Sequence, residues 1–430
     1  MVEPDATATS TMRKVNLRIV PFVVICMFIS YLDRVNVGFA ALEMNRDLHF
    51  TATVFGWGVS AFFVTLCLCE VPSNMAMRRF GARLWISRIM ITWGIISGAT
   101  AFITGVKSFV AMRFLLGAAE AGFFPGVILY LTYWFPREHR AKAMSFFVMA
   151  LPISNFIGSP ISGALLGTEG WLGLHGWQWL FIIEAVPAVI LGLLALIWMP
   201  STPREAAWLT PAEQDWLAAA LAAERTDPAL VATHSPWKTM LHPRVLALAV
   251  IYSGSVGAAY ALSYWQPQIV KSFGLTNLQT GFVSAIPFGF AAVAMVLWAQ
   301  RSDTTGERVW HTALPLLLSA AGLGACMMMT TLTPTMLALT VALVGIYAAK
   351  APIFALTAES LSAAASPVGI AQVCAVGNIA SLVCPFLVGW IKDLSGSFRM
   401  GLLPMVLLAL VAATVTLTLG RPRPVLAEAQ

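Results

Sequence analysis

Eight charged side chains within the apolar runs of this chain are the residues whose chemistry could serve a function. They are Asp33, Arg34, Glu70, Arg113, Glu120, Glu184, Lys350 and Glu359. A charge at the centre of a membrane-spanning helix costs about 3 kcal/mol on insertion scales, so it needs a partner, water or a purpose. None of the six histidines lies in the middle of an apolar run. Protons carried through these runs must therefore bind to Asp or Glu.

Two acids and two arginines lie at overlapping depths in the first and fourth apolar runs. Asp33 and Arg34 are adjacent, so on a helix they point about 100° apart. Arg113 and Glu120 are seven residues apart, close to two turns, and share one helix face. The four side chains could form a mutually compensating network. The alternative is that they are structural ion pairs that hold the two helices together.

Arginine and a desolvated carboxylic acid are the groups that coupled transport of an anion and a proton requires. Arginine keeps its charge and presents a planar fork that matches a carboxylate. Desolvation favours the protonated form of an acid, whereas a neighbouring arginine favours the ionised form. A bound organic anion that takes the arginine from a resident carboxylate therefore makes that carboxylate bind a proton.

The remaining charged candidates have less distinctive surroundings. Glu70 lies near the end of the second run beside an arginine-rich turn, where a conformational latch is favoured over a substrate contact. Glu184 is taken as structural. Lys350 has no acid one turn away, because Glu359 is nine residues on and about 180° round the helix. Lys350 either faces a central cavity as a second anchor for an anion, such as a dicarboxylate, or extends to the membrane surface.

The elements that position these residues must be membrane-spanning helices. The 430 residues are 58% hydrophobic and 11% charged, with a mean hydropathy of +0.78. A bilayer needs about 20 apolar residues per spanning helix. We therefore expect an all-α membrane protein with twelve spans. They lie near residues 17–40, 54–76, 86–106, 108–130, 144–167, 178–199, 245–268, 280–300, 310–330, 335–357, 370–394 and 400–420.

The polar stretches divide the chain into two bundles of six helices and indicate an orientation. The expected parts are a tail at 1–16, a bundle at 17–199, a linker at 200–243, a bundle at 244–420 and a tail at 421–430. With both termini in the cytoplasm, the cytoplasmic segments hold 18 Lys and Arg residues and the outer segments five. This excess predicts that both termini are cytoplasmic.

The two expected bundles share sequence features at a constant offset of 225 residues. The repeated pairs are Thr51 and Thr276, Gly56 and Gly281, Gly81 and Gly306, Arg83 and Arg308, Trp85 and Trp310, and Pro160 and Pro385. A constant offset in corresponding spans predicts a duplicated six-helix unit. In transporters built from such repeats, the substrate binds between the bundles near the midplane.

Several segments resemble the major facilitator superfamily, and more specifically its anion:cation symporter family. They are Tyr-Leu-Asp-Arg-Val-Asn at 31–36, Glu-Val-Pro-Ser-Asn at 70–74, Arg-x-x-x-Gly-x-x-Glu-Ala-Gly-Phe-Phe-Pro-Gly at 113–126 and Tyr-Leu-Thr-Tyr-Trp-Phe-Pro at 130–136. Members of that family include tartrate, phthalate, hydroxyphenylacetate, nicotinate and sugar-acid permeases. Two departures are an arginine, Arg78, where the superfamily turn usually has an acid, and Leu66 where many relatives have tyrosine. Leu66 favours a less hydroxylated or aromatic acid as substrate.

The resemblance implies roles for the site residues. It makes Asp33 and Glu120 the proton carriers and Arg34 a residue of the substrate site or its network, and it pairs Arg113 with Glu120. Two further groups are expected from the resemblance and from the charges described above. Substrate contacts are expected at Tyr31, Phe354 and Asn378, besides Arg34, Arg113 and Lys350, and gating residues at Glu70, Arg78, Arg83, Asp303 and Arg308. Tyr260, Tyr264, Trp265 and Gln266 could also line the cavity.

These observations predict a proton-coupled symporter that imports a tartrate-, phthalate- or aromatic-acid-like carboxylate across a bacterial inner membrane by alternating access. We expect a monomer that meets protons, a small organic anion and membrane lipid, with no cofactor, no metal and no nucleic acid. An exporter of organic anions or drugs would have the same fold. A polytopic membrane enzyme is disfavoured, because the sequence has no His-rich metal cluster, nucleophile elbow or phosphate-binding loop.

Overall fold

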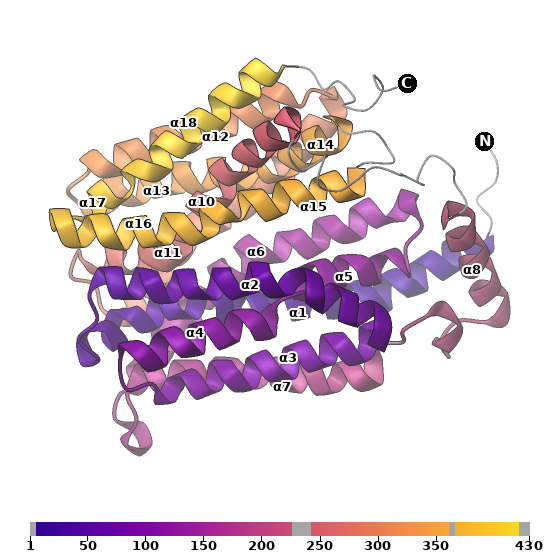
Figure 1. Ribbon diagram of the computed structural model, residues 1–430, viewed down its shortest axis with the longest axis horizontal. Coiled ribbons are helices and arrows are strands. Elements are labelled where there is room, and N and C mark those ends of the chain that lie inside the picture. Colours follow the sequence, from indigo (N-terminus) through magenta and orange to yellow (C-terminus); the bar gives the residue numbers. More distant parts are fainter. Residues whose placement is uncertain (1–5, 226–241, 361–365, 421–430) are drawn as a thin grey trace.

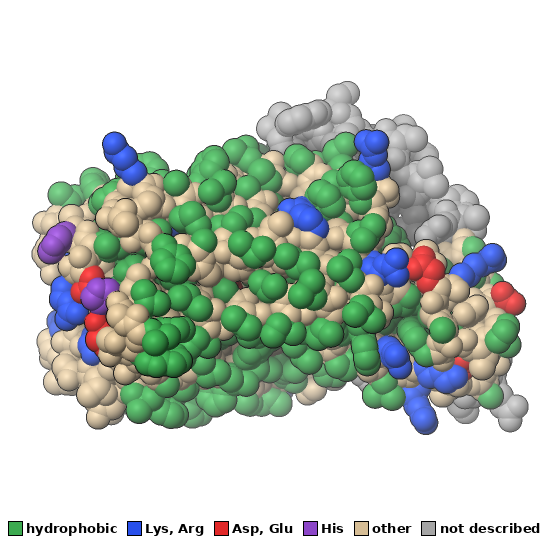
Figure 2. All heavy atoms as spheres, turned by 90° about the horizontal axis from the view of Figure 1, so that it is seen from below, with side chains coloured by type: hydrophobic (Ala, Val, Ile, Leu, Met, Phe, Trp, Pro, Cys, Tyr) green, Lys and Arg blue, Asp and Glu red, His purple; other side chains and the backbone are tan. Residues whose placement is uncertain are grey.

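The computed structural model describes residues 6–225, 242–360 and 366–420, and it confirms an all-helical protein with twelve helices that could cross a membrane (Figure 1). On the face seen in Figure 2, hydrophobic side chains are spread over the surface between the two ends of the molecule, whereas most of the charged side chains gather toward the ends. The spans are Ala6–Asp47, Ala52–Phe80, Ala82–Phe102, Val106–Thr132, Glu138–Thr168, Gly176–Trp198, Pro243–Lys271, Asn277–Thr305, Val309–Met328, Leu332–Ser360, Gln372–Ser395 and Phe398–Leu419.

The first half contains seven helices for its six spans. They are α1 (Ala6–Asp47), α2 (Ala52–Phe80), α3 (Ala82–Ala99), α4 (Val106–Glu120), α5 (Phe123–Thr132), α6 (Arg137–Leu165) and α7 (Gly176–Trp198). The fourth span is divided because Gly122 adopts a φ of 86°, which is costly for any residue with a side chain. The chain therefore bends directly after Glu120, one of the candidate proton carriers.

The second half is divided more often. Its helices are α10 (Pro243–Lys271), α11 (Asn277–Thr305), α12 (Val309–Met328), α13 (Leu332–Ala348), α14 (Lys350–Ser360), α15 (Ser366–Gly377), α16 (Ile379–Ser395), α17 (Phe398–Gly401) and α18 (Leu403–Leu419). Two of these breaks divide the tenth and eleventh spans of the chain, and they fall at Ala349 and Asn378. Two residues singled out from the sequence, Lys350 and Asn378, therefore lie at helix interruptions.

The linker between the halves contributes a helix, α8 (Pro211–Arg225), that packs against the beginning of α1. Lys14 of α1 bonds to Glu213 of α8 at 2.8 Å. Helix α1 begins at Ala6, so it extends back through most of the expected 1–16 tail. Residues 226–241 of the expected linker and the expected tail at 421–430 lie outside the described residues. We call the end of the molecule that carries α8 the linker face and the opposite end the far face (Figure 1).

The internal repeat is visible in the helices themselves. Helices α2 and α11 are both 29 residues long, and they begin and end 225 positions apart. Thr51 and Thr276 accept hydrogen bonds from the backbone N–H groups three residues on, and so cap the two helices. The boundaries and caps of these two helices therefore match the predicted duplication.

Repeated residues also make equivalent contacts between the halves. Gly56 of α2 lies against the backbone of Pro385 and Phe386 of α16, and Gly281 of α11 lies against Ser159 and Pro160 of α6. A methyl group on Gly281 would lie 2.5 Å from the Ser159 carbonyl oxygen. Such backbone contact requires glycine. The two halves therefore meet by the same glycine-on-proline packing on each side of the pseudo-symmetry axis.

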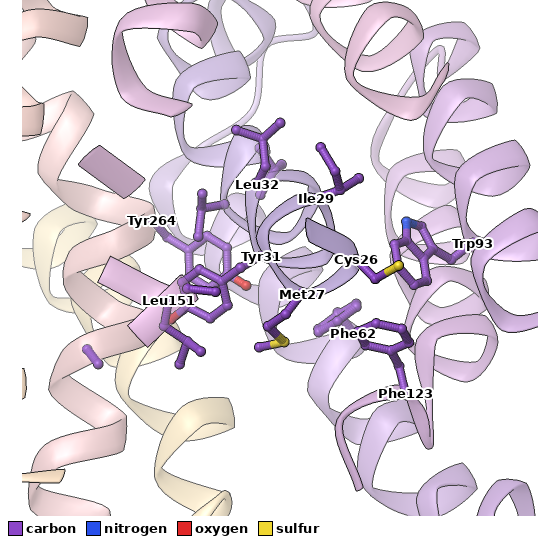
Figure 3. Close-up of a cluster of buried hydrophobic side chains, with 14 of the residues drawn as sticks. Cys26, Met27, Ile29, Tyr31, Leu32, Phe62, Trp93, Phe123, Leu151 and Tyr264 are labelled. Carbon is purple, nitrogen blue, oxygen red and sulfur yellow. The ribbon is translucent and has the colours of Figure 1, made fainter. Parts of the chain in front are cut away.

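Helix α1 crosses the middle of this assembly and faces two sets of neighbours (Figure 3). Cys26 points toward Trp93 of α3, whereas Tyr31 points to the side of α1 where Tyr264 of α10 lies. All four side chains are buried. One side of α1 thus packs within the first half and another forms part of the contact between the halves.

Candidate functional site

The four charged residues expected to act together are all buried in the first half. Asp33 is 1% exposed, Arg34 7%, Arg113 2% and Glu120 2%. The first pair lies on α1 and the second on α4. Burial of ionised side chains requires compensating partners, because desolvation costs several kcal/mol per ion. The partners that each residue has therefore indicate what it can do.

Arg34 connects an acid of the first half with a tyrosine of the second. Its Nη2 atom forms an ion pair with Oε1 of Glu120, and the same oxygen accepts a hydrogen bond of 2.9 Å from Ser30. Its Nη1 atom donates a hydrogen bond of 2.8 Å to the hydroxyl of Tyr260 on α10. The guanidinium therefore lies where the two halves meet, with one side toward each half.

Aromatic rings surround this guanidinium. The Arg34 Cζ atom lies 6.0 Å from the ring centroid of Tyr31, 5.4 Å from that of Phe62 and 5.9 Å from that of Tyr260. The Tyr260 ring also lies 4.8 Å from that of Phe63. Rings at these distances stabilise a cation and exclude water, so a charge-assisted bond made there is stronger than in water. Tyr31 thus lies beside the arginine expected to bind substrate.

Asp33 points away from the contact between the halves. Its Oδ1 atom accepts hydrogen bonds from the hydroxyl of Ser97 on α3 and from Asn36 at 3.3 Å. Its Oδ2 atom has no hydrogen-bond partner among the described residues. Asp33 and Arg34 thus diverge as helical geometry requires. Of the two, it is Arg34 that faces the second half.

The expected pairing of Arg113 with Glu120 is wrong. Glu120 bonds to Arg34, whereas Arg113 lies over the rings of Phe109 and Phe181 at 5.9 and 5.8 Å. Seven residues of helix rise about 10.5 Å, which is long for a direct bond between side chains on one face. The Nε and Nη2 atoms of Arg113 have no hydrogen-bond partner among the described residues.

Arg113 forms no ion pair with an acid among the described residues, and its guanidinium lies within electrostatic range of Tyr264, Asp33 and Glu120. Glu120 already has Arg34 as its partner, which leaves Asp33 as the acid available to balance Arg113. The four residues therefore divide into a hydrogen-bonded ion pair, Arg34 with Glu120, and a longer-range pair, Arg113 with Asp33. Both pairs join α1 to α4. This arrangement is also what the alternative hypothesis, structural ion pairs that hold the two helices together, would predict.

Lys350 is buried in the second half and is 7% exposed, so it does not extend to the surface. Its ammonium lies 5.3 Å from the Tyr347 ring centroid and within electrostatic range of Cys374 on α15. No carboxylate forms an ion pair with it among the described residues. Of the two alternatives left open by the sequence, this burial contradicts extension to the membrane surface, and the role as a second anchor for an anion stays a prediction.

The two other expected substrate residues of the second half lie on neighbouring helices. Phe354 of α14 contacts the ring of Tyr252 on α10 at 5.7 Å. Asn378 lies at the break between α15 and α16 and is half-buried. Neither residue contacts Arg34, so the structure does not bring the expected substrate residues into one cluster.

The expected gating residues behave differently in the two halves. Arg308 bonds to Asp303 at 2.8 Å and to Glu359 of α14 at 2.9 Å. The equivalent turn after α2 has an exposed Arg78 and a half-buried Arg83. Neither of these arginines forms an ion pair with a carboxylate in the part of the chain that the structure describes.

Glu70 forms no ion pair with that arginine-rich turn in the described part of the chain. It is within electrostatic range of Arg34 in the first half and of Tyr252 and Cys374 in the second. The latch between Glu70 and the turn, as expected from the sequence, is not formed in this conformation. The Glu70 carboxylate is thus within electrostatic range of groups in both halves.

Polar contacts close the far face, and sequence reasoning missed them. Asp393 of α16 accepts hydrogen bonds from the backbone N–H groups of Ala52 and Thr53, at 3.2 and 2.7 Å, at the beginning of α2. Asn277 of α11 donates a hydrogen bond of 2.5 Å to Glu43 of α1. The signal that could have indicated the first contact is Thr51, because a helix N-terminus attracts a carboxylate. Nothing in the sequence relates this helix start to Asp393, which is about 340 positions away.

Comparisons with known proteins identify the family of the chain. The family model for the Major Facilitator Superfamily matches residues 23–381. A protein of Agrobacterium vitis named "Putative tartrate transporter" is 49% identical over 416 residues, which are 97% of this chain and 96% of that protein. "Putative metabolite transport protein NicT" of Pseudomonas putida is 40% identical over 387 residues, 89% of this chain and 88% of its own.

The fold has solved counterparts as well. An inward-facing bacterial homolog of the human lysosomal transporter Spinster has a TM-score of 0.75 at 15% identity, over 94% of this chain and 96% of that one. An identity this low extends the likeness to the fold alone.

Proposed function

Since the chain belongs to the major facilitator superfamily and is a multi-pass membrane transporter rather than an enzyme, we propose that it is a proton-coupled symporter that imports a small organic carboxylate by alternating access. The substrate is tartrate-like, phthalate-like or an aromatic acid. The name of the Agrobacterium vitis relative supports a tartrate-like dicarboxylate. The 18-to-5 distribution of Lys and Arg supports an inner-membrane protein with its linker face in the cytoplasm.

The observation that carries this proposal is the place of Arg34 between Glu120 and Tyr260. A permanently charged guanidinium at the contact between the halves can receive an anion from a path between them. An incoming carboxylate replaces Glu120 at Nη2 and Tyr260 at Nη1, which are the two prongs that a bidentate arginine–carboxylate contact uses.

Coupling to protons follows from the displacement of Glu120. In the empty site the Glu120 carboxylate is stabilised by Arg34 and by the hydroxyl of Ser30. When the anion occupies Arg34, Glu120 keeps only the neutral Ser30 partner in a dry environment, which favours its protonated form. Substrate and proton then bind together, and the site stays close to electrically neutral as the halves rearrange.

Lys350 supplies a second cation for a dicarboxylate from the second half. It is buried and has no carboxylate partner among the described residues, whereas Arg34 already has one. An anion with two carboxylates could therefore neutralise one cation of each half. A monocarboxylate leaves Lys350 without a partner, so a dicarboxylate is expected to bind more tightly.

The test is uptake of radiolabelled tartrate, phthalate and benzoate into proteoliposomes under an imposed pH gradient, alkaline inside. The wild-type protein is expected to accumulate one of these anions. Glu120→Gln and Asp33→Asn are expected to abolish proton-driven accumulation while retaining some exchange of internal for external anion. Glu138→Gln, at an exposed position near the start of α6, is the control and should accumulate the anion normally. Full accumulation by either of the first two variants would remove that acid from the coupling role.

The role of Arg34 is tested in the same vesicles by measuring the affinity for the anion rather than its accumulation. Arg34→Ala is expected to weaken anion affinity by more than tenfold, because a charge-assisted contact is worth about 1.5–3 kcal/mol. An unchanged affinity contradicts its role as the anchor. Uptake by the wild-type protein that ignores the pH gradient contradicts proton coupling as a whole.

A further inference from the structure

A buried acid that the proposed function does not use lies on α7. Glu184 is 2% exposed, and its Oε1 atom accepts a hydrogen bond of 2.7 Å from Ser162 of α6. Its Oε2 atom has no hydrogen-bond partner among the described residues. A buried carboxylate oxygen without a donor is costly, whereas the same oxygen carrying a proton is neutral and needs only an acceptor.

One amide lies between this acid and Asp33. Asn36 of α1 donates from Nδ2 to Oδ1 of Asp33 at 3.3 Å, and its side chain also lies within hydrogen-bonding reach of Glu184. The Oδ1 atom of Asn36 is a buried acceptor that lacks a donor among the described residues, as are Oδ2 of Asp33 and Oε2 of Glu184. These three neighbouring side chains therefore contain three buried acceptor oxygens without a donor, and a proton on one of the two acids would supply a donor.

The charges around Glu184 lead to the same conclusion. Helix α7 packs against α1, α3 and α6. The charged group that faces Glu184 from α1 is Asp33, an acid, while α6 contributes the neutral Ser162.

On α3, Arg88 lies over the Trp85 ring at 4.1 Å, on the linker-face side, and Ser97 bonds to Asp33. The cation that acts on Asp33 is Arg113, which lies over the ring of Phe181 on α7. Glu120 also lies within electrostatic range of Arg113, but Glu120 already has Arg34 as its partner. Two acids therefore share one cation.

We propose that Glu184 is a second proton-binding site, which holds a proton on Oε2 while Asp33 is ionised against Arg113. Two carboxylates in a dry site beside one arginine cannot both remain ionised, so the pair titrates as a unit and keeps one proton. Asp33 retains two hydrogen-bond donors and the cation, so it is the acid that ionises. Glu184 retains one neutral donor and is the acid that stays protonated.

The site has a place in the transport cycle, and this part rests on the proposed function. Glu184 follows the far-face start of α7 by eight residues, about 12 Å along the helix. Helix α1 runs toward the far face, and Asn36, which links the two acids, lies about one turn beyond Asp33 on that side. Glu184 thus lies on the far-face side of Asp33. In the transfer step the O–H bond on Glu184 Oε2 breaks and an O–H bond on Asp33 Oδ2 forms, so that proton and negative charge exchange places without another reactant.

Infrared spectroscopy of the purified full-length protein in lipid tests the protonation directly, without reference to transport. A buried protonated carboxylic acid has a carbonyl stretching band above the amide region that an ionised acid lacks. The wild-type protein is expected to show this band at about pH 7. Glu184→Gln should lose it, and Glu138→Gln, which alters an exposed acid, should retain it. A band that persists unchanged in Glu184→Gln overturns the proposal.

A second variant keeps the test valid if Glu184→Gln does not fold. Ser162→Ala removes the donor to Oε1 but leaves the acid in place, so the band is expected to shift because its carbonyl loses a hydrogen bond. An unshifted band contradicts the assignment. If wild-type uptake ignores the pH gradient while the band depends on Glu184, the proposed symport fails and the proton site stands.

The role in the cycle has its own measurement in proteoliposomes. Glu184→Gln is expected to retain anion exchange but to shift the pH dependence of proton-driven uptake, because Asp33 loses its proton donor. A structural role alone would lower the amount of folded protein without moving the pH profile. An unmoved profile in a folded variant removes Glu184 from the proton path.

Discussion

Arg34 of α1 donates a hydrogen bond of 2.8 Å to the hydroxyl of Tyr260 on α10, and this contact joins the two halves of the transporter at the depth of its buried ion pair. The contact makes the state of the substrate site depend on how the halves are arranged. When the halves separate there, Arg34 loses a partner and can accept a different one. Anion binding and domain rearrangement are therefore linked through a single guanidinium.

Tyr260→Phe should destabilise the empty protein more than the substrate-bound one. The variant keeps the ring beside Arg34 but leaves Nη1 without its acceptor, at a cost of about 1–3 kcal/mol. An anion that binds Nη1 restores the missing contact. We therefore expect a lower melting temperature without substrate and a larger upward shift on adding the anion than in the wild-type protein. Tyr133→Phe, a half-buried tyrosine next to α5, is the control. Equal shifts in all three proteins would contradict this prediction.

Gly281→Leu should stop transport without unfolding the protein. The new side chain would meet the Ser159 carbonyl oxygen, which already lies 2.5 Å from an added methyl group, and would hold α6 and α11 apart at the far face. Overpacking of this kind costs about 1–3 kcal/mol, and it acts only on the conformation in which that face is closed. Anion exchange in proteoliposomes measures the effect. Gly324→Leu on α12 is the matched control, because none of the described atoms lies within 4 Å of a methyl group placed there, and its exchange rate should remain normal.

Arg308→Ala should lower stability more than Arg83→Ala, although the two arginines occupy equivalent repeat positions. Partial burial opposes the charge of Arg308, but its bonds to Glu359 and Asp303 outweigh that effect and raise its pKa. These pairs are partly exposed, so the difference should be at most about 1 kcal/mol. Thermal unfolding of both variants measures it, and high salt should reduce it. A larger loss in Arg83→Ala would show that the first-half turn has the stronger latch.

His175→Gln should change the pH dependence of stability at the far face. The hydrogen bond of 2.7 Å between His175 and Glu169 raises the pKa of the histidine, while the Gly176 N–H and then the histidine lower the pKa of Glu169. A raised histidine pKa gives stabilisation that is complete below the unfolded value of about 6.5 and is lost as pH rises through the folded value. A lowered glutamate pKa gives stabilisation that is present above about 4.3 and is lost as pH falls through the folded value.

The difference in melting temperature between the wild-type protein and His175→Gln should therefore be largest between about pH 4.3 and 6.5 and should shrink above that range. His139→Gln, an exposed histidine near the start of α6, should show no such window. A difference that stays constant across the whole range would indicate that His175 contributes packing rather than charge.

Helix boundaries and repeats follow closely from the sequence. Apolar runs are long because the bilayer offers no hydrogen bonds to the backbone, so hydropathy alone locates all twelve spans. The sequence predicts a first span that begins near residue 17, but α1 begins at Ala6, since the polar residues ahead of the membrane still form helix against α8. The residues that the sequence pairs at an offset of 225 have equivalent roles in the structure: Thr51 and Thr276 cap their helices, and Gly56 and Gly281 pack against proline-containing segments of the other half.

The sequence by itself determined which residues are charged within the membrane, at what depth they lie and in which direction each points relative to its own helix. It therefore placed Asp33 and Arg34 on different sides of α1. Only the tertiary structure decided their partners: Glu120 bonds to Arg34 and not to Arg113, and Asp33 faces α3. Helical periodicity fixes positions within one helix, whereas pairing depends on how far each helix is rotated and shifted against its neighbours. Those rotations are set by packing over the whole bundle, as are the burial of Lys350 and the meeting of Asp33, Asn36 and Glu184.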